Sequence, residues 1–249
     1  MDKTLLKGLQ VLEHVVASSD PVRSTDVATT LGLMQSNAHR VLKTLQHAGY
    51  LVQDPQSRTF SGSLKLWELG SQIVGRLDLR RSASVQLHEL AQETGEAVHL
   101  SILDQAEVIY IDKIDSPQAV GAYTRTGGRA PAHCVATGKA LLSQLSEESL
   151  APLLTNLKRF SPNTITGAKA LADELRLTRE RGYSVNKGEW REGVWGLASV
   201  IFDARDEPVA AVGVSGPDFR LCEPERTAEM GEAVKRYARA ISLQLGNRA

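Results

Sequence analysis

Cysteine is scarce in this sequence. Cys134 and Cys222 are the two cysteines among 249 residues, and two thiols so far apart do not make a disulfide framework. The six histidines show no spacing typical of metal ligands, so the two thiols also fall short of a metal site. We therefore expect reduced thiols, no metal and no cofactor.

Long apolar runs are missing as well. No stretch reaches the ~18 uninterrupted apolar residues that a membrane span needs. The N-terminal residues lack the apolar core of a signal peptide. These absences predict a protein that makes no membrane contact and stays in the cytoplasm.

An excess of charge of one sign is also lacking, because 29 basic residues balance 29 acidic ones. Nucleic-acid-binding proteins usually show a basic excess, so the total charge argues against simple binding of this kind. Between residues 35 and 65, however, the chain is locally basic. The charged residues there are Arg40, Lys43, Arg58, Lys65 and Asp54. Any contact with nucleic acid is therefore expected in this short segment.

The first 63 residues have the pattern of a small helical domain with a hairpin. Apolar residues recur at helical spacing three times and are followed by two short β-rich runs. The expected helices span residues 4–16, 24–31 and 35–48, and the expected strands span 50–53 and 58–61. Gly32 falls in the short connection between the second and third helices, which suits a sharp crossing. The layout is that of a winged helix-turn-helix.

The outer face of the third expected helix carries side chains that can hydrogen-bond bases or phosphates. They are Gln35, Ser36, Asn37, Arg40 and Lys43, and Arg58 adds a further cation on the wing. We expect Asn37 and Arg40 to contact base edges, and Lys43 and Arg58 to contact phosphates or the minor groove. Two plainer interpretations remain: an ordinary solvated helix face, or a three-helix module that binds another protein.

Residues 64–82 are expected to form a linker helix between two domains, spanning 1–63 and 83–249. Apolar residues occupy more than one face of the helical segments after Ser63, and Gly70 and Gly75 suggest a bend. A helix of this kind usually pairs with something, and helix-turn-helix proteins commonly dimerise to contact two half-sites. Dimerisation is therefore the simplest expectation for this segment.

Beyond Gly95 the spacing of the apolar residues changes. The new pattern predicts an antiparallel sheet with interspersed helices, so the whole is expected to be an α+β protein. The expected strands span 97–103, 107–112, 119–123, 183–186, 197–202 and 209–214. The expected helices span 139–145, 147–154, 168–181 and 224–245. Residues 127–131 are expected to be irregular because two glycines and a proline fall there.

Residues 127–140 form the segment most suggestive of chemistry. A helix is expected to begin at about Thr137, which leaves the backbone amides from Ala136 to Lys139 free at its start. Free amides and the helix dipole together make an anion site. The plainer interpretation is a glycine-rich turn in which Thr137 caps the helix.

Three sharper interpretations of this segment differ in the chemistry they need. A P-loop is excluded, because His133 stands where the motif has glycine and Ala140 where it has Ser or Thr. A nucleophilic Cys134 would need a base, and the adjacent His133 points to the opposite face of an extended segment. His99 would have to supply that base from elsewhere, so a Cys-dependent hydrolase stays as the alternative. A carboxylate pocket in which no reaction occurs requires the fewest assumptions.

A second stretch offers groups that complete such a pocket. Asn186 and Glu189 are polar side chains at a strand end, and Gly196 allows close approach. Trp190 and Trp195 are candidate pocket walls, although core packing is the more usual role of Trp.

The ordered set of motifs resembles the IclR family of transcription regulators over nearly the whole chain. The resemblance rests on Arg40–Leu45, Gly49–Leu51, Gly128–Ala140, Arg181–Ser184, Gly193–Ala198 and Val214–Pro217. It implies a winged helix-turn-helix joined by a linker helix to a GAF-like α/β effector domain with an antiparallel sheet. It also implies homodimers, often paired into tetramers, that bind double-stranded operator DNA.

The resemblance further implies a small carboxylate effector: a keto acid, a sugar acid or an aromatic acid. The positions that match the family's effector pocket are Ala136 and Thr137 through their amides, Asn186, Gly196, Gly213 and Ser215. Asn186 stands where an acidic residue can occur, and the two glycines carry no side-chain donor. We therefore expect a roomier pocket that takes a bulkier sugar acid or aromatic acid, and a regulator with no catalytic residue.

Overall fold

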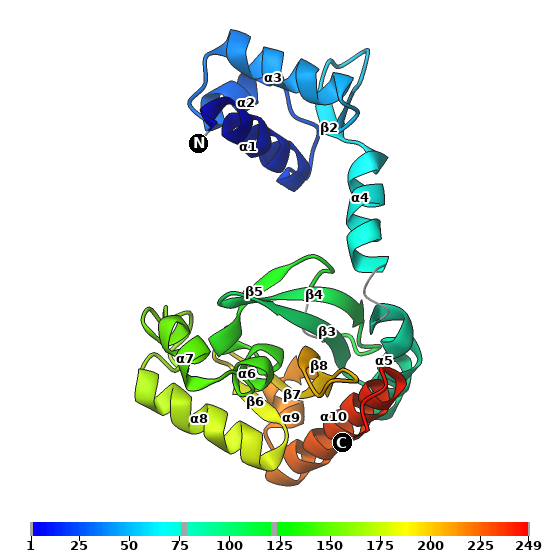
Figure 1. The fold of residues 1–249 in the computed structure, drawn as a ribbon, viewed down its shortest axis with the longest axis vertical. Helices are drawn as coiled ribbons and strands as arrows, with labels where there is room; N and C mark the ends of the chain where they lie inside the picture. The colour runs from blue at the N-terminus through cyan, green and yellow to red at the C-terminus, as the bar shows by residue number, and fades with distance from the viewer. Residues whose placement is uncertain (1, 76–78, 121–123, 249) are drawn as a thin grey trace. The chain divides into compact units, whose positions relative to one another are not determined.

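The computed structural model describes residues 2–75, 79–120 and 124–248. The chain divides into two compact units, residues 1–76 and residues 77–249, and each is described by itself (Figure 1). Among the described residues, no helix has both the length and the apolar character needed to cross a membrane.

The first unit contains the expected helices and hairpin. Its elements are α1 (Lys3–Ala17), α2 (Ser24–Thr30), α3 (Gln35–His47), β1 (Leu51–Gln53), β2 (Phe60–Gly62) and α4 (Leu64–Gly75). β1 and β2 pair antiparallel. Gly32 has a φ of +61°, and this left-handed conformation, which favours glycine, turns the chain sharply between α2 and α3. The winged helix-turn-helix layout is therefore confirmed.

The core of this unit joins the wing to the helices. Val11, Leu42 and Phe60 are almost fully buried there. Val22, which precedes α2, exchanges two backbone hydrogen bonds with Phe60, at 2.9 and 2.8 Å. The hairpin is thereby fixed to the helical part, and the outer face of α3 keeps a constant position relative to the wing.

The returning wing strand begins later than expected. Arg58 was predicted to open this strand, but its φ is +58° and its N–H donates to the Asp54 carbonyl at 2.9 Å. The Asp54 carboxylate also accepts the N–H groups of Gln56 and Ser57. Arg58 therefore belongs to the turn, and the strand starts at Phe60.

The second unit is built around one antiparallel sheet. The strands are β3 (Ala97–Asp104), β4 (Glu107–Ile114), β5 (Arg129–Pro131), β6 (Ser184–Lys187), β7 (Val194–Phe202) and β8 (Pro208–Pro217). Their spatial order is β5-β4-β3-β8-β7-β6, and every neighbouring pair is antiparallel. The helical elements are α5 (Leu79–Thr94), η1 (Ala132–Cys134), α6 (Ala136–Leu142), α7 (Glu147–Leu150), η2 (Ala151–Leu154), α8 (Ala168–Arg181), α9 (Asp218–Leu221) and α10 (Pro224–Gln244).

Helices cover both faces of this sheet. α5 and α10 pack on one face, while α6, with α8 behind it, packs on the other. Successive strand residues point to opposite faces, so Ala211 belongs to the core under α6 and Val212 to the core under α5 and α10. The predicted α+β fold with an antiparallel sheet is confirmed.

Three local expectations for the second unit need correction or comment. The segment 127–131 is not wholly irregular, because Arg129–Pro131 forms β5 and pairs with β4 while Ala130 is buried. α6 begins at Ala136 with Val135 as its cap, so Thr137 is not the capping residue. The strand expected at 119–123 falls largely on residues 121–123, which lie outside the described residues, and 119–120 are not in a strand.

The start of α6 packs directly on the preceding turn. A Cβ added at Gly138 would lie 2.2 Å from the Ala132 carbonyl oxygen, well inside any real contact. Only glycine fits there, and the first turn of α6 is held against η1 as a result. This contact positions the amides that the sequence singled out.

The expected linker is shared between the two units. α4 lies in the first unit and α5 in the second. The predicted division into 1–63, 64–82 and 83–249 remains a prediction about which parts act as domains.

Candidate functional site

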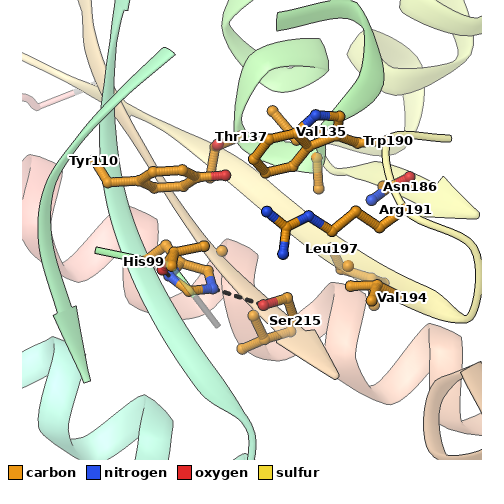
Figure 2. Close-up of a pocket in the computed structure, with 15 residues that line it drawn as sticks. His99, Tyr110, Val135, Thr137, Asn186, Trp190, Arg191, Val194, Leu197 and Ser215 are labelled. Carbon is orange, nitrogen blue, oxygen red and sulfur yellow. Dashed lines mark hydrogen bonds between the residues drawn. The ribbon is translucent and has the colours of Figure 1, made fainter. Parts of the chain in front are cut away.

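One cavity of about 260 Å³ lies on the α6 face of the sheet (Figure 2). The six residues predicted for a ligand pocket all line it, although they come from four different elements. These residues are Ala136 and Thr137 of α6, Asn186 of β6, Gly196 of β7, and Gly213 and Ser215 of β8. The fold thus brings together positions up to 79 residues apart, counted from Ala136 to Ser215.

The two glycines allow α6 to approach the sheet. A Cβ at Gly213 would meet the Leu197 carbonyl oxygen at 2.7 Å and Thr137 Cγ2 at 3.1 Å. A Cβ at Gly196 would lie 3.0 Å from the Val214 carbonyl oxygen. A side chain at Gly213 would push the first turn of α6 away from β7 and β8. Gly213 therefore lacks a side-chain donor and is also required for the close packing of α6 on the sheet.

The first turn of α6 presents backbone amides beside the cavity. Ala136 and Thr137 occupy the first two helical positions, where N–H groups have no acceptor within the helix. The expected run of free amides ends sooner than predicted, because the Lys139 N–H donates to the Val135 carbonyl at 2.9 Å. The amides and the positive end of the helix dipole both favour an anion at this point.

A neutral histidine lies among hydroxyl groups on the opposite wall of the cavity. His99 of β3 pairs in register with Gly213 of β8, so its side chain reaches the same face. Its Nε2 lies 2.6 Å from Ser215 Oγ, and its Nδ1 lies 3.1 Å from Thr124 Oγ1. The ring of Tyr110 stands 5.3 Å from the imidazole, centroid to centroid.

Burial lowers the pKa of His99 to about 4, so the ring is uncharged near neutral pH. A neutral imidazole has one N–H donor and one acceptor nitrogen. One of its two hydroxyl partners therefore donates to the ring and the other accepts from it. From the sequence, His99 was a candidate only as a base for Cys134, and the structure instead joins it to Ser215 and Thr124.

The connection between β6 and β7 carries two further lining residues. Trp190 and Arg191 lie on this loop, residues 188–193, and both line the cavity (Figure 2). The Arg191 guanidinium carbon stands 4.7 Å from the centroid of the Trp190 ring. Trp190 is thus a wall, as expected. Trp195 is not among the lining residues and packs instead against the core under α5 and α10.

A buried ion pair fixes this loop to α6. Lys139 is fully buried and donates from Nζ to Glu189 Oε1 at 2.7 Å and to the Val185 carbonyl at 2.5 Å. The Glu189 N–H donates to Asn186 Oδ1 at 2.9 Å. The polar groups of Asn186 and Glu189, which the sequence offered as ligand contacts, are therefore partly engaged in holding the loop.

Two hydroxyl groups from the segment before α8 also hold the β6–β7 loop in place. Ser161 Oγ donates to the Gly188 carbonyl at 2.7 Å, and Thr164 Oγ1 donates to the Glu189 carbonyl at 2.6 Å. Both hydroxyl residues are buried. The loop that carries Trp190 and Arg191 is thus anchored through its backbone.

Cys134 does not have the surroundings of a nucleophile. It is completely buried, and its burial and the charge of Glu189 raise the pKa of the thiol to about 12. The thiolate is the reactive form, and at neutral pH the fraction of Cys134 present as thiolate is therefore negligible. His133 points elsewhere, with Nε2 3.0 Å from the Lys158 carbonyl oxygen. Within the described ranges, no three His, Cys, Asp or Glu side chains are grouped so as to hold a metal ion.

The polar face of α3 forms the second candidate surface, in the first unit. Arg40 Nη2 donates to Asn37 Oδ1 at 3.1 Å, which joins the two residues expected to contact bases. Lys43 Nζ donates to Gln53 Oε1 of β1 at 3.1 Å and so connects the helix to the wing. The other predicted contacts, Gln35, Ser36 and Arg58, are exposed.

Comparisons with known proteins agree on one family. The family model described as "Bacterial transcriptional regulator IclR C-terminal" matches residues 71–243, and "IclR helix-turn-helix domain" matches residues 4–55. The HTH-type transcriptional regulator XynR of Escherichia coli is 35% identical over 242 residues, which is 96% of each chain.

Solved structures agree with this result. The crystal structure of Thermotoga maritima IclR superposes with a TM-score of 0.82 at 31% identity and covers 98% of both chains. An IclR homologue from Microbacterium hydrocarbonoxydans, complexed with 4-hydroxybenzoate, superposes with a TM-score of 0.86 at 25% identity. That match covers 98% of this chain and 99% of the homologue.

The Lys139–Glu189 pair yields a prediction about stability. Lys139→Met leaves the Glu189 carboxylate buried without its partner, so we expect a loss of about 3–5 kcal/mol. The double variant Lys139→Met, Glu189→Gln removes both charges and should recover a large part of that loss. Differential scanning calorimetry of the full chain measures the melting of the second unit.

Arg176→Gln is the matched control, because Arg176 forms an exposed pair with Glu180 at 2.7 Å. Exposed pairs contribute about 0–1 kcal/mol. Equal melting temperatures for Lys139→Met and Arg176→Gln would show that the buried pair does not hold the fold together.

Proposed function

The chain belongs to the IclR family of transcriptional regulators, and from that premise we propose that a small carboxylate in the cavity modulates its binding to operator DNA. The family makes it a DNA-binding transcription regulator and not an enzyme. The observation that carries the proposal is the cavity itself. Its described lining brings the six matched positions together and contains no acidic side chain.

We propose that the carboxylate binds at the start of α6. The amides of Ala136 and Thr137 donate to its oxygens, and the Ser215 hydroxyl and the Asn186 side chain complete the contacts. Hydrogen bonds from backbone amides to a charged acceptor are stronger than those between neutral groups. Binding of the acid involves no covalent step. The nearby Cys134 thiol is buried and protonated, so it does not act as a nucleophile.

The size of the cavity favours a sugar acid or an aromatic acid over a two-carbon acid. A volume of about 260 Å³ is close to the lower end of the ~300–1,000 Å³ range of pockets that bind drug-sized ligands. A two-carbon acid would leave most of this space unfilled. Tyr110 and Trp190 line the cavity with flat rings, and the homologue that contains 4-hydroxybenzoate has the same fold. A keto acid remains the smaller candidate.

On the DNA side, we propose that α3 enters the major groove. Asn37 and Arg40 contact base edges, and their mutual hydrogen bond orients the guanidinium. Lys43 and Arg58 contact phosphates or the minor groove. Gln35 and Ser36 lie at the start of α3, where they approach the sugar-phosphate backbone of the DNA.

We propose that a second copy of the chain covers an apolar stripe on α4, giving a homodimer that can pair into a dimer of dimers. Leu64 and Trp67 are 78% and 70% exposed and lie three residues apart on one side of the helix. Large apolar side chains seldom cluster on a free surface. Such a dimer presents two copies of α3 to half-sites about one helical turn, ~34 Å, apart.

The effector site is tested by removing one amide. Ala136→Pro deletes the N–H of the first helical position, where proline is tolerated. Val135 already has φ −124° and ψ 149°, a conformation that suits a residue before proline. We expect isothermal titration calorimetry with gluconate, 4-hydroxybenzoate and glyoxylate to show tightest binding for one of the larger acids in wild-type protein. We expect that affinity to fall about tenfold or more in the variant, because a hydrogen bond from a backbone N–H to a charged acceptor is lost.

Glu147→Pro is the matched control, since Glu147 occupies the first position of the exposed helix α7 after Ser146. It should leave acid binding unchanged. Preference for glyoxylate would overturn the proposal of a roomy pocket, and equal affinity in wild type and Ala136→Pro would remove the amide from the site.

The DNA interface is tested at Arg40. Loss of a bidentate base contact costs about 1–3 kcal/mol, so Arg40→Ala should weaken operator binding by roughly 5-fold to 160-fold. It should also relax the preference at one base pair. Fluorescence anisotropy with a duplex selected from a random pool by the wild-type protein measures both. Lys7→Ala, an exposed cation on α1, should change neither, and unchanged affinity in Arg40→Ala would exclude this residue as a base contact.

The dimer is tested at Trp67. Trp67→Glu places a charge in the proposed interface, so we expect the dimer to dissociate at micromolar concentration. We also expect operator affinity to fall, because two half-sites are no longer bound together. Analytical ultracentrifugation gives the mass. Glu68→Gln, on the adjacent exposed position, should remain dimeric, and a dimeric Trp67→Glu would place the interface elsewhere.

A further inference from the structure

Arg191 is a cation that points into the cavity, and among the described residues no carboxylate pairs with it. Figure 2 shows its guanidinium between the rings of Trp190 and Tyr110 on one side and Ser215 on the other. Within the described ranges, its guanidinium lies over the face of Trp190. An arginine that lacks an ion pair inside the protein is free to bind an anion from solution.

Arg191 is also the sole ionised side chain among the fifteen described residues that line the cavity. No Asp, Glu or Lys occurs among them. His99 is neutral near pH 7, because burial lowers its pKa to about 4, and burial raises the pKa of Tyr110 to about 12. The described lining therefore carries a net charge of one positive unit.

The loop that carries Arg191 is held in place before any ligand arrives. Glu189, two positions earlier, is buried against Lys139. The Arg191 carbonyl accepts the Val194 N–H at 3.2 Å, which closes the end of the loop. A guanidinium on an anchored backbone loses less conformational freedom on binding than one on a mobile loop.

We propose that Arg191 determines the charge class of the ligand: its guanidinium pairs with the carboxylate bound in this cavity and restricts the pocket to monoanions. The inference rests on the proposed function, which supplies the carboxylate at α6. A neutral analogue offers the guanidinium no opposite charge. A dianion brings a second charge that no cation in the described lining compensates, and desolvation of that charge is unfavourable.

The test compares acids with their own primary amides, so that shape is held nearly constant while charge is removed. Isothermal titration calorimetry of the full chain uses lactate and lactamide, gluconate and gluconamide, and benzoate and benzamide. We expect wild-type protein to bind at least one acid about tenfold or more tightly than its amide. Arg191→Gln should weaken binding of that acid by about tenfold or more and leave binding of the amide within twofold.

Two variants control for structure and for charge. Arg191→Lys keeps the charge and should retain more acid affinity than Arg191→Gln. Arg205→Gln removes an exposed arginine in the β7–β8 turn and should bind every probe as wild type does. Unchanged melting temperatures in all three variants show that the fold is intact.

A separate comparison tests the restriction of the pocket to monoanions. Malate resembles lactate with a second carboxylate, so wild-type protein should bind malate more weakly than lactate. Tighter binding of malate that is lost in Arg191→Gln would overturn the restriction to one charge. Equal affinity of wild type and Arg191→Gln for the acids would overturn the role of Arg191 and leave the proposed function standing. Failure of wild-type protein to bind any of the acids would overturn the proposed carboxylate site as well.

Discussion

A buried lysine–glutamate contact connects the two walls of the cavity. Lys139 belongs to the helix whose first turn offers the backbone amides, and Glu189 belongs to the loop that holds Trp190 and Arg191. Buried ion pairs contribute little net stability compared with apolar packing, because both charges must leave water. Their value here is geometric. The pair joins the helix that carries the amides to the loop that carries Arg191.

The small residues around α6 follow from the same constraint. Gly138 leaves no room for a Cβ against Ala132, and Gly213 leaves none against Thr137 and the backbone of β7. α6 thus lies closer to η1 and the sheet than ordinary side chains allow. Gly138 and Gly213 thus allow the backbone N–H groups of α6 to reach the cavity, where side chains would otherwise stand.

Much of the fold was predictable from the sequence, since long helices and paired strands have clear periods. The backbone half of the pocket was also found, because small residues at a helix start are a local signal. Of the lining side chains, Asn186, Trp190 and Ser215 were expected from the sequence, but His99 and Arg191 were not. His99 reaches the cavity through its register opposite Gly213, more than a hundred residues away, and Arg191 through the course of a short loop. Neither depends on a local pattern. β5 was missed because a three-residue strand containing Pro131 has too few positions to show alternation.

The cavity lies wholly within residues 77–249, and the polar face of α3 lies wholly within residues 1–76. A ligand changes DNA binding only by differing in affinity for two arrangements of the protein. Any such difference must therefore be transmitted from the second unit to the first. The cavity is suited to generate it, because its ligand would contact α6 and the β6–β7 loop together. A ligand that contacts both walls would favour the arrangement in which their spacing fits it.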